Sequence, residues 1–246
     1  MNAKQAALTT LFEEFSAKMP DNDALGIEGA NLVAAKLGGT VDEIKKNFSA
    51  FVFETEKTIY QIYKIHEEAA GDGVLAKFLA ANRGRPIYRL LDAFYLSIAQ
   101  SRKSRAGKAF EGIIRGLFKQ CNYPFDENKV INGKPDFIMP SEDHFRTHAA
   151  DCIIFTAKRT VRERWRQIVT EGTQGAAFFL ATLDDKVTSE QIGEMRKKKI
   201  YLVAPATLKN STVYQHEPNV ISFEDFFADH LDLDPAVSRW KRHKII

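Results

Sequence analysis

Two stretches of the sequence decide the fold: GKPDFIMP at residues 133–140 and DCIIFTAKRTVRERWRQI at residues 151–168. Each contains a short apolar run bounded by polar or turn-forming residues, which is typical of a buried strand. The first stretch places Asp136 at the start of its run, and the second places Lys158 directly after its run. The two stretches therefore predict an acid on one strand and a lysine on the next.

The alternation of apolar runs with charged helical patterns predicts a mixed α/β fold after Asn122. Strands are expected at residues 130–138, 151–157, 177–182 and 200–204, because short runs rich in Ile, Val and Phe alternate there with charged helical patterns. The intervening helices are expected at 162–172 and 189–199, and two further helices at 223–231 and 235–241. We therefore expect a mixed sheet flanked by helices.

The chain before this region reads as helical. Gly38 and Gly39 end one helix, and Thr40 with Glu43 forms a capping box for the next, which Asp72 and Gly73 break. Further helices are expected at 86–100 and 104–121. We expect a helical N-terminal region at residues 1–80, serving dimerisation or DNA contact, and a catalytic and recognition core at 81–246.

The charge of the chain is unevenly distributed. Residues 1–80 carry 8 Lys against 12 Asp and Glu, whereas residues 81–171 carry 17 Lys and Arg against 10 acids. A basic middle third suits a surface that binds phosphates by releasing counterions, although a solvated helical face has the same composition.

The remaining composition points to an ordinary intracellular protein. The N-terminus has no apolar stretch long enough for a signal peptide or a membrane span, so we expect a cytoplasmic location. Cys121 and Cys152 are far apart and lie among apolar residues, which favours reduced structural thiols. His144 and His148 lie near Pro140 in an expected loop, with no thiol or carboxylate at a suitable spacing, so we expect solvated histidines rather than a zinc site.

The acid and the lysine suit metal-assisted hydrolysis of a phosphodiester. Carboxylates that hold Mg²⁺ and a nearby lysine neutralise the phosphate, deprotonate a water and stabilise the leaving oxygen. In the usual PD-(D/E)XK signature the second acid lies two residues before the lysine, but here that residue is Thr156. Glu171, at the end of the helix expected after Lys158, is the replacement we consider.

The run from Lys158 to Ile168 resembles the corresponding helix of the PD-(D/E)XK restriction endonucleases of the EcoRII, PspGI and SsoII group, in which the second acid is likewise moved onto the helix. The resemblance extends to the basic segment 101–108 with the acid Glu111 after it, and to residues 218–221. It covers roughly residues 86–227 and implies a restriction-endonuclease-like fold.

By this resemblance Asp136 and Glu171 bind Mg²⁺, Lys158 orients or activates the attacking water, and Glu111 supports the site through water or a second metal. The simpler interpretations are a turn acid after Pro135, a lysine at a strand end and an exposed helical glutamate.

The cluster Arg162, Glu163 and Arg164 is the candidate for base recognition. Arg bonds guanine O6 and N7, and Glu accepts from cytosine N4. The resemblance implies a homodimer that cuts double-stranded DNA at a CC…GG palindrome of the CCNGG or CCWGG type, with 5′ overhangs and base flipping, and a cognate DNA methyltransferase as functional partner. The alternative interpretation of this cluster is a charged, solvated start of a helix with no role in base recognition.

Three further cations, Arg102, Lys103 and Arg105, are expected to contact the DNA backbone, where they fix register without reading sequence. Two other functions stay open at this stage: a catalytically silent DNA-binding module, and a repair-type nuclease of the same fold.

Overall fold

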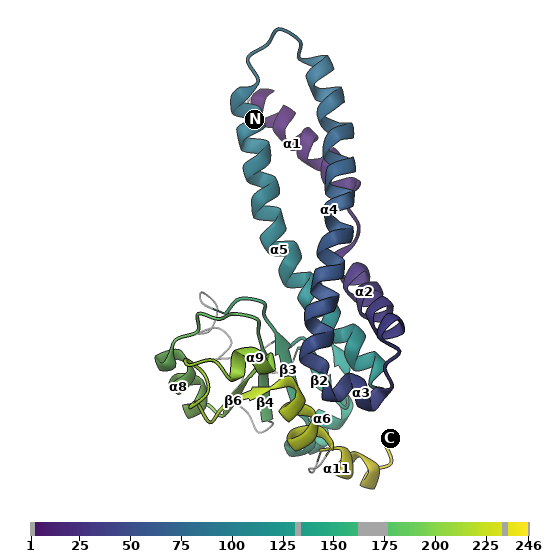
Figure 1. The fold of residues 1–246 in the computed structure, drawn as a ribbon, viewed down its shortest axis with the longest axis vertical. Helices are drawn as coiled ribbons and strands as arrows, with labels where there is room; N and C mark the ends of the chain where they lie inside the picture. The colour runs from purple at the N-terminus through teal and green to yellow at the C-terminus, as the bar shows by residue number, and fades with distance from the viewer. Residues whose placement is uncertain (1–2, 131–133, 162–176, 233–235, 246) are drawn as a thin grey trace.

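A computed structural model describes residues 3–130, 134–161, 177–232 and 236–245, and it divides visibly into a long helical arm and a sheet region (Figure 1). The first helices are α1 (Ala3–Ala17), α2 (Asn22–Leu37) and α3 (Val41–Lys46). The arm consists of α4 (Phe48–Ala81) and α5 (Tyr88–Gln120), which run antiparallel with α1 lying against them (Figure 1). Gly38 ends α2 in the left-handed conformation, and the predicted Thr40–Glu43 capping box starts α3.

Two predicted helix ends are wrong. α4 continues through Asp72 and Gly73, and α5 continues through the expected break at residues 101–103. A glycine inside a helix costs only about 1 kcal/mol, and the burial of Ala70 and Val74 on either side of Gly73 outweighs it. In α5 the buried residues Ile98 and Phe110 flank the polar segment in the same way.

The described residues contain a six-stranded sheet in the order β1 to β6, as in the chain. β1 (Asp126–Glu127), β2 (Phe137–Met139) and β3 (Ile153–Ala157) pair antiparallel. β3, β4 (Ala177–Ala181), β5 (Ile200–Ala204) and β6 (Val220–Ser222) pair in parallel. The mixed α/β architecture with a helical N-terminal region is confirmed. The short strands β1 and β6 were not predicted.

Alternate residues of the strands enter two separate apolar cores, as strand geometry requires. Phe155 and Phe179 belong to the larger core, where Phe155 packs edge-on against Phe118 of α5 at 5.0 Å between ring centroids. Ile154 and Leu180 belong to the smaller core beneath α8 (Ser189–Lys197). The sheet is therefore covered on both faces, and α5 is the helix that spans from arm to sheet.

Short helices complete the sheet region. They are α6 (Glu142–His148), the 3₁₀ turn η1 (Ala149–Asp151), α9 (Ala206–Lys209), α10 (Phe223–Asp225), the π-helix η2 (Phe226–Asp232) and α11 (Ala236–Arg242). The loop predicted at His144 and His148 is wrong, because Ser141 caps a helix there by accepting from the backbone N–H of His144. The helix expected at 162–172 lies outside the described residues.

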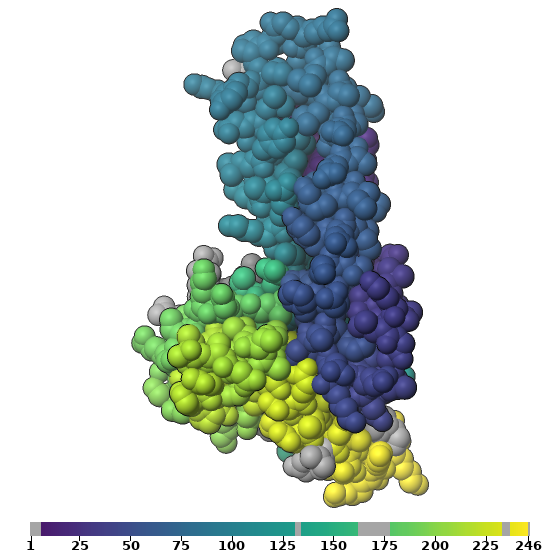
Figure 2. Space-filling model, viewed as in Figure 1, coloured from purple at the N-terminus to yellow at the C-terminus, as the bar shows by residue number. Residues whose placement is uncertain are grey.

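The arm is joined to the sheet region by polar contacts at its base. Glu224 of α10 accepts from the backbone N–H and from Oγ of Ser49, both at 2.7 Å, in the first turn of α4. Arg159, just after β3, donates to Glu56 of α4 at 2.6 Å. The space-filling view shows the arm rising from the sheet region as one continuous body (Figure 2).

Both cysteines are free and buried, and burial raises the pKa of each thiol to about 12, as expected of structural thiols. In the described residues no helix is long and apolar enough to cross a membrane.

Candidate active site

Asp136 stands immediately before β2, beside the end of β3, and its side chain is almost fully buried. Its Oδ2 accepts hydrogen bonds from Oγ1 of Thr156 at 2.8 Å and from the backbone N–H of Ala157 at 2.7 Å. These bonds come from the neighbouring antiparallel strand, so the register of β2 against β3 fixes the direction in which the carboxylate points.

Lys158 completes the pair that the sequence predicted. Its Nζ lies 3.0 Å from Oδ1 and 2.8 Å from Oδ2 of Asp136, and about a quarter of its side chain is exposed. The backbone N–H of Lys158 donates to the carbonyl of Ala181 on β4, which anchors the lysine at the edge of the parallel part of the sheet. The acid and the lysine are therefore held together between adjacent strands, with the lysine reaching solvent.

Glu111 of α5 faces this pair. Burial raises the pKa of Glu111, and the negative charge of Asp136 raises it further, while Lys158 and Arg115 act in the opposite direction. Two carboxylates that lie close together across a partly buried space are a typical setting for a cation.

Arg115 is a residue of this site that sequence reasoning missed. It is buried, donates from Nη2 to Glu111 at 3.1 Å and from Nε to Glu127 of β1 at 2.7 Å, and so holds Glu111 from behind. In the sequence, this ion pair could be predicted only from the spacing of four residues, which places Glu111 and Arg115 on one face of a helix. The partner Glu127 lies on another element and carries no local signal.

The position of Glu111 also depends on how closely α2 approaches α5. A Cβ added to Gly26 of α2 would lie 2.8 Å from the Cα of Gly112. Such a contact is possible only between two glycines, so the helices cross with their backbones touching. The crossing point is at Gly112, the residue next to Glu111, so the approach of α2 acts on the stretch of α5 that carries Glu111.

A second hydrogen bond fixes the backbone where the chain continues beyond Lys158. The backbone N–H of Val161 donates to Oδ2 of the buried Asp184, which follows β4, at 2.9 Å. Beyond Val161 the chain passes outside the described residues. The predicted metal ligand Glu171 and the predicted base-reading residues Arg162, Glu163 and Arg164 all lie there, so their roles stay predictions.

The predicted backbone-contacting residues lie higher on α5. Arg102 forms two bonds to the buried Glu67 of α4, from Nε at 2.7 Å and from Nη2 at 2.6 Å, with half of its side chain exposed. Arg105 donates to Ser101 in the preceding turn, and Lys103 is exposed. Arg102 and Arg105 line a cavity of about 440 Å³ between α4 and α5 that reaches Arg159 at the end of β3.

Comparison with known protein families identifies the chain. The family described as EcoRII C terminal matches residues 79–227, more than half of the sequence. The chain belongs to this family. The matched range of the EcoRII C-terminal domain contains every predicted site residue, and the resemblance seen from residues 158–168 is confirmed.

Two curated relatives of this EcoRII C-terminal protein are named as type II restriction enzymes. SsoII of Shigella sonnei is 31% identical over 150 residues, which are 56% of this chain and 49% of SsoII. EcoRII of Escherichia coli is 33% identical over 118 residues, which are 46% of this chain and 29% of EcoRII. The chain therefore matches about half of one relative and less than a third of the other.

Solved structures share the fold of this EcoRII C-terminal protein. Metal-depleted Ecl18kI in complex with uncleaved, modified DNA aligns with a TM-score of 0.77 at 24% identity, covering 99% of this chain and 91% of that one. A PspGI–substrate DNA complex aligns with a TM-score of 0.65 at 24% identity, covering 89% and 93%. The expected restriction-endonuclease-like fold is thus confirmed over nearly the whole chain.

Proposed function

We propose that this protein is a type II site-specific endonuclease that hydrolyses phosphodiester bonds in double-stranded DNA with the help of a divalent metal ion, Mg²⁺. The observation that carries the proposal is the group formed by Asp136, Lys158 and Glu111, in which the lysine contacts the acid at 2.8 Å and a second acid faces both. Membership of the EcoRII C-terminal family and the restriction enzymes among its relatives support it.

The donor atoms at this group fit Mg²⁺, which prefers hard oxygen ligands and keeps several waters. Among the described residues Oδ2 of Asp136 accepts three hydrogen bonds, while Oδ1 accepts only from Lys158 and so keeps a lone pair available. Glu111 offers a second carboxylate and Glu171 the third, on the segment after Val161. Asp136 and Glu171 would hold the ion, with Glu111 supporting it directly or through water.

A bound divalent ion would neutralise charge on the scissile phosphate and lower the pKa of a water. The other tasks belong to the chain itself. Thr156 and the backbone N–H of Ala157 fix Asp136, so that Oδ1, which accepts only from Lys158, keeps one direction. Lys158 is the cation that reaches solvent beside the acid, placed to orient the attacking water and to stabilise negative charge on the phosphate.

Sequence recognition is assigned to Arg162, Glu163 and Arg164, which follow the anchored residue Val161. Arg and Glu side chains at the start of the helix that the sequence predicts there could read two adjacent G·C pairs in the major groove. We propose a target of the CC…GG type, CCNGG or CCWGG, read by the two subunits of a homodimer and cut with 5′ overhangs and extrusion of the central bases. A cognate methyltransferase would protect host DNA in the cytoplasm.

The basic residues of α5 would supply backbone contacts in this proposal. Lys103 is exposed and free of the bonds that hold its neighbours in the described part of the chain, which suits a phosphate contact. About half of the Arg102 side chain is exposed while it is paired with Glu67. Arg102 would therefore contact a phosphate without breaking its ion pair with Glu67.

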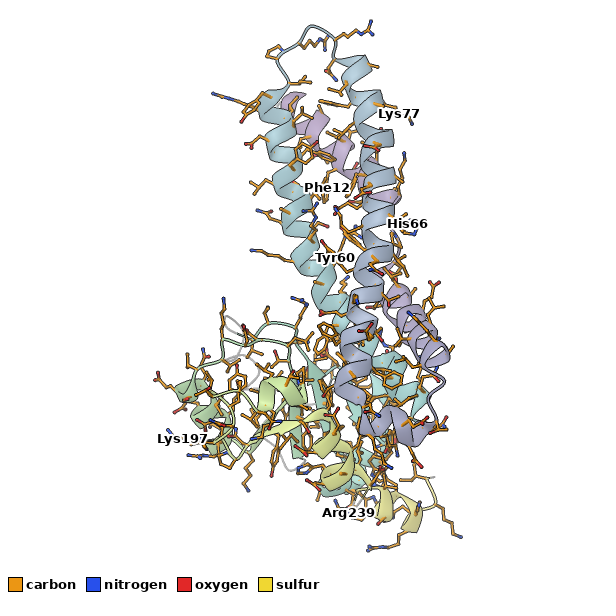
Figure 3. All side chains as sticks on the ribbon, in the orientation of Figure 1. Phe12, Tyr60, His66, Lys77, Lys197 and Arg239 are labelled. Carbon is orange, nitrogen blue, oxygen red and sulfur yellow. The ribbon has the colours of Figure 1, made fainter. Side chains whose placement is uncertain are left out.

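The test is digestion of a sequenced plasmid with the purified protein in Mg²⁺ or in EDTA, with every cut end mapped. We expect discrete fragments ending at CC…GG sites, absent in EDTA and in Lys158→Ala and Asp136→Asn. The matched control is Lys197→Ala. Lys197 is an exposed lysine of α8 at the end of the sheet region away from the helical arm (Figure 3), and this variant should cut DNA normally.

Other outcomes separate the alternatives. Intact DNA that the protein nevertheless binds would favour a silent DNA-binding module. Cuts scattered over the plasmid, or confined to unusual DNA structures, would favour a repair-type nuclease. Loss of discrete cutting in Arg162→Ala and Arg164→Ala, with DNA binding retained, would support their assignment as base readers.

A further inference from the structure

A cluster of three histidines and an aspartate joins α6 and η1 to the C-terminal end of the described chain, apart from the catalytic group. His144 and His148 come from α6, Asp151 from η1, and His243 follows α11. Ring centroids are 4.9 Å apart for His144 and His148, 5.2 Å for His144 and His243, and 4.6 Å for His148 and His243. The cluster lies at the opposite end of the molecule from the arm tip, near the labelled Arg239 (Figure 3).

The potential donor atoms of this cluster converge. One ligand atom each from His144, Asp151 and His243 lie within 4.8 Å of one another. Zinc bound at about 2.0–2.1 Å from each ligand needs donor atoms roughly 3.3 Å apart, so the three side chains would close on the ion by rotation. Nε2 of His144 is shielded from solvent and has no hydrogen-bond partner among the described residues. A buried ring nitrogen of this kind requires a partner.

The carboxylate of the cluster is fixed by other residues, as in a metal site with an outer layer of supporting contacts. Nε of Arg239 lies 2.7 Å from Oδ1 of Asp151, which leaves Oδ2 beside Nε2 of His243 at 3.4 Å. The backbone carbonyl of Asp151 accepts from Nε1 of the fully buried Trp240 at 2.9 Å. Residues of α11 therefore hold both the carboxylate and the backbone carbonyl of Asp151. The remaining carboxylate oxygen faces the ring of His243.

The neighbouring rings also act on one another electrostatically, since burial and the rings of His148 and His243 lower the pKa of His144. The thiol of the buried Cys152 nearby points to the backbone carbonyl of His148 at 3.7 Å and is not part of the donor set.

We propose that His144, Asp151 and His243 bind a transition-metal ion of the zinc class, with water as the fourth ligand and with His148 stacked on His144 to hold its ring. Two imidazoles and one carboxylate select Zn²⁺, Co²⁺ or Ni²⁺ over Mg²⁺ and Ca²⁺, which take oxygen ligands. The ion would fasten α11 to the α6–η1 segment. This site is separate from the Mg²⁺ site of the proposed function and does not depend on it.

The test is a titration of the full chain, stripped with EDTA, with ZnCl₂ by calorimetry and with Co²⁺ by visible absorption. The Asp136→Ala variant is used beside the native chain, so that metal bound at the catalytic group is not counted. We expect one tightly bound Zn²⁺ in Asp136→Ala, a tetrahedral Co²⁺ spectrum, and a higher Tm with Zn²⁺ but not with Mg²⁺.

His243→Ala is the decisive variant, because His243 is exposed and its truncation leaves the core intact. Combined with Asp136→Ala, it should weaken Zn²⁺ binding at least 100-fold and abolish the Tm increase, with an unchanged circular dichroism spectrum. His66→Ala, an exposed histidine on the arm (Figure 3), should bind as before. Absence of Zn²⁺ binding by Asp136→Ala, or equal binding after His243→Ala, would overturn the proposal.

Discussion

Thr156 donates its hydroxyl hydrogen to Oδ2 of Asp136 at 2.8 Å, and it does so from the position where related signatures carry an acid. In this chain a buried hydroxyl supports the acid of the preceding strand instead of offering a carboxylate of its own. The second carboxylate must then come from another element. Glu111 of α5 faces the site, and Glu171 is the candidate on the segment beyond Val161.

This bond predicts a difference between two substitutions at Thr156. Thr156→Val keeps the shape but removes the donor, so Asp136 loses a supporting bond and DNA cleavage should fall about 10- to 100-fold. Thr156→Ser keeps the donor and should stay close to the native rate. Single-turnover cleavage of plasmid over a range of Mg²⁺ concentrations measures both. Equal rates for Thr156→Val and the native chain would contradict the role of this hydroxyl.

Glu67 predicts a dependence of stability on pH. Burial raises the pKa of Glu67, but the hydrogen bonds from Arg102 and Lys64 outweigh it and lower that pKa from 4.5 to about 2. Because the folded-state pKa is depressed, the stabilisation is present above about pH 4.5 and is lost as the pH falls towards 2. Glu67→Gln should therefore lower the free energy of unfolding at pH 7 by about 1.5–3 kcal/mol, with a smaller difference below pH 4.

Urea unfolding at several pH values measures this effect. The control is Glu68→Gln, the next residue, whose side chain is 71% exposed and lies 3.9 Å from Lys64. It should change the unfolding free energy little at any pH. A constant difference between Glu67→Gln and the native chain from pH 7 to pH 3 would be inconsistent with the proposed linkage.

The crossing of α2 and α5 predicts opposite effects for two glycine substitutions. Gly26→Ala places a Cβ 2.8 Å from the backbone of Gly112 and should cost about 1–3 kcal/mol of stability. It should also reduce cleavage, because Glu111 adjoins the crossing. Gly71→Ala on α4 meets nothing within 4 Å and should stabilise the protein by about 0.5–1 kcal/mol. Thermal unfolding compares the two, and a neutral Gly26→Ala would mean that the helices separate easily.

The contact of Glu224 with Ser49 predicts that this one side chain makes a measurable contribution to holding the base of the arm on the sheet region. Glu224→Ala leaves the backbone N–H of Ser49 without its partner at the start of α4, which should cost about 1–3 kcal/mol. Glu190→Ala, an exposed acid in the first turn of α8, should cost under about 0.5 kcal/mol. Chemical unfolding provides the comparison. Similar losses for both variants would show that Glu224 acts only as a charge at a helix end.

Features coded by neighbouring residues could be predicted from the sequence. The runs at 153–157 and 200–204 are strands, the Thr40–Glu43 box starts a helix, and Gly38 ends one. The pairing of Asp136 with Lys158 is predictable because each residue directly adjoins a recognisable strand. Local patterns failed at Gly73 and at residues 101–103, where burial on both sides keeps the helix continuous.

The sequence by itself determined the family, the mixed sheet and the acid–lysine pair, because periodicity, capping and motif spacing act over a few residues. Only the tertiary structure decided that Arg115 joins Glu111 to Glu127, that Asp184 anchors Val161, and that Asp151 meets His243. Several of these pairs join residues far apart in the chain. Their geometry follows from the packing of helices on the sheet, which buries apolar side chains and brings the polar groups together only once the core has formed.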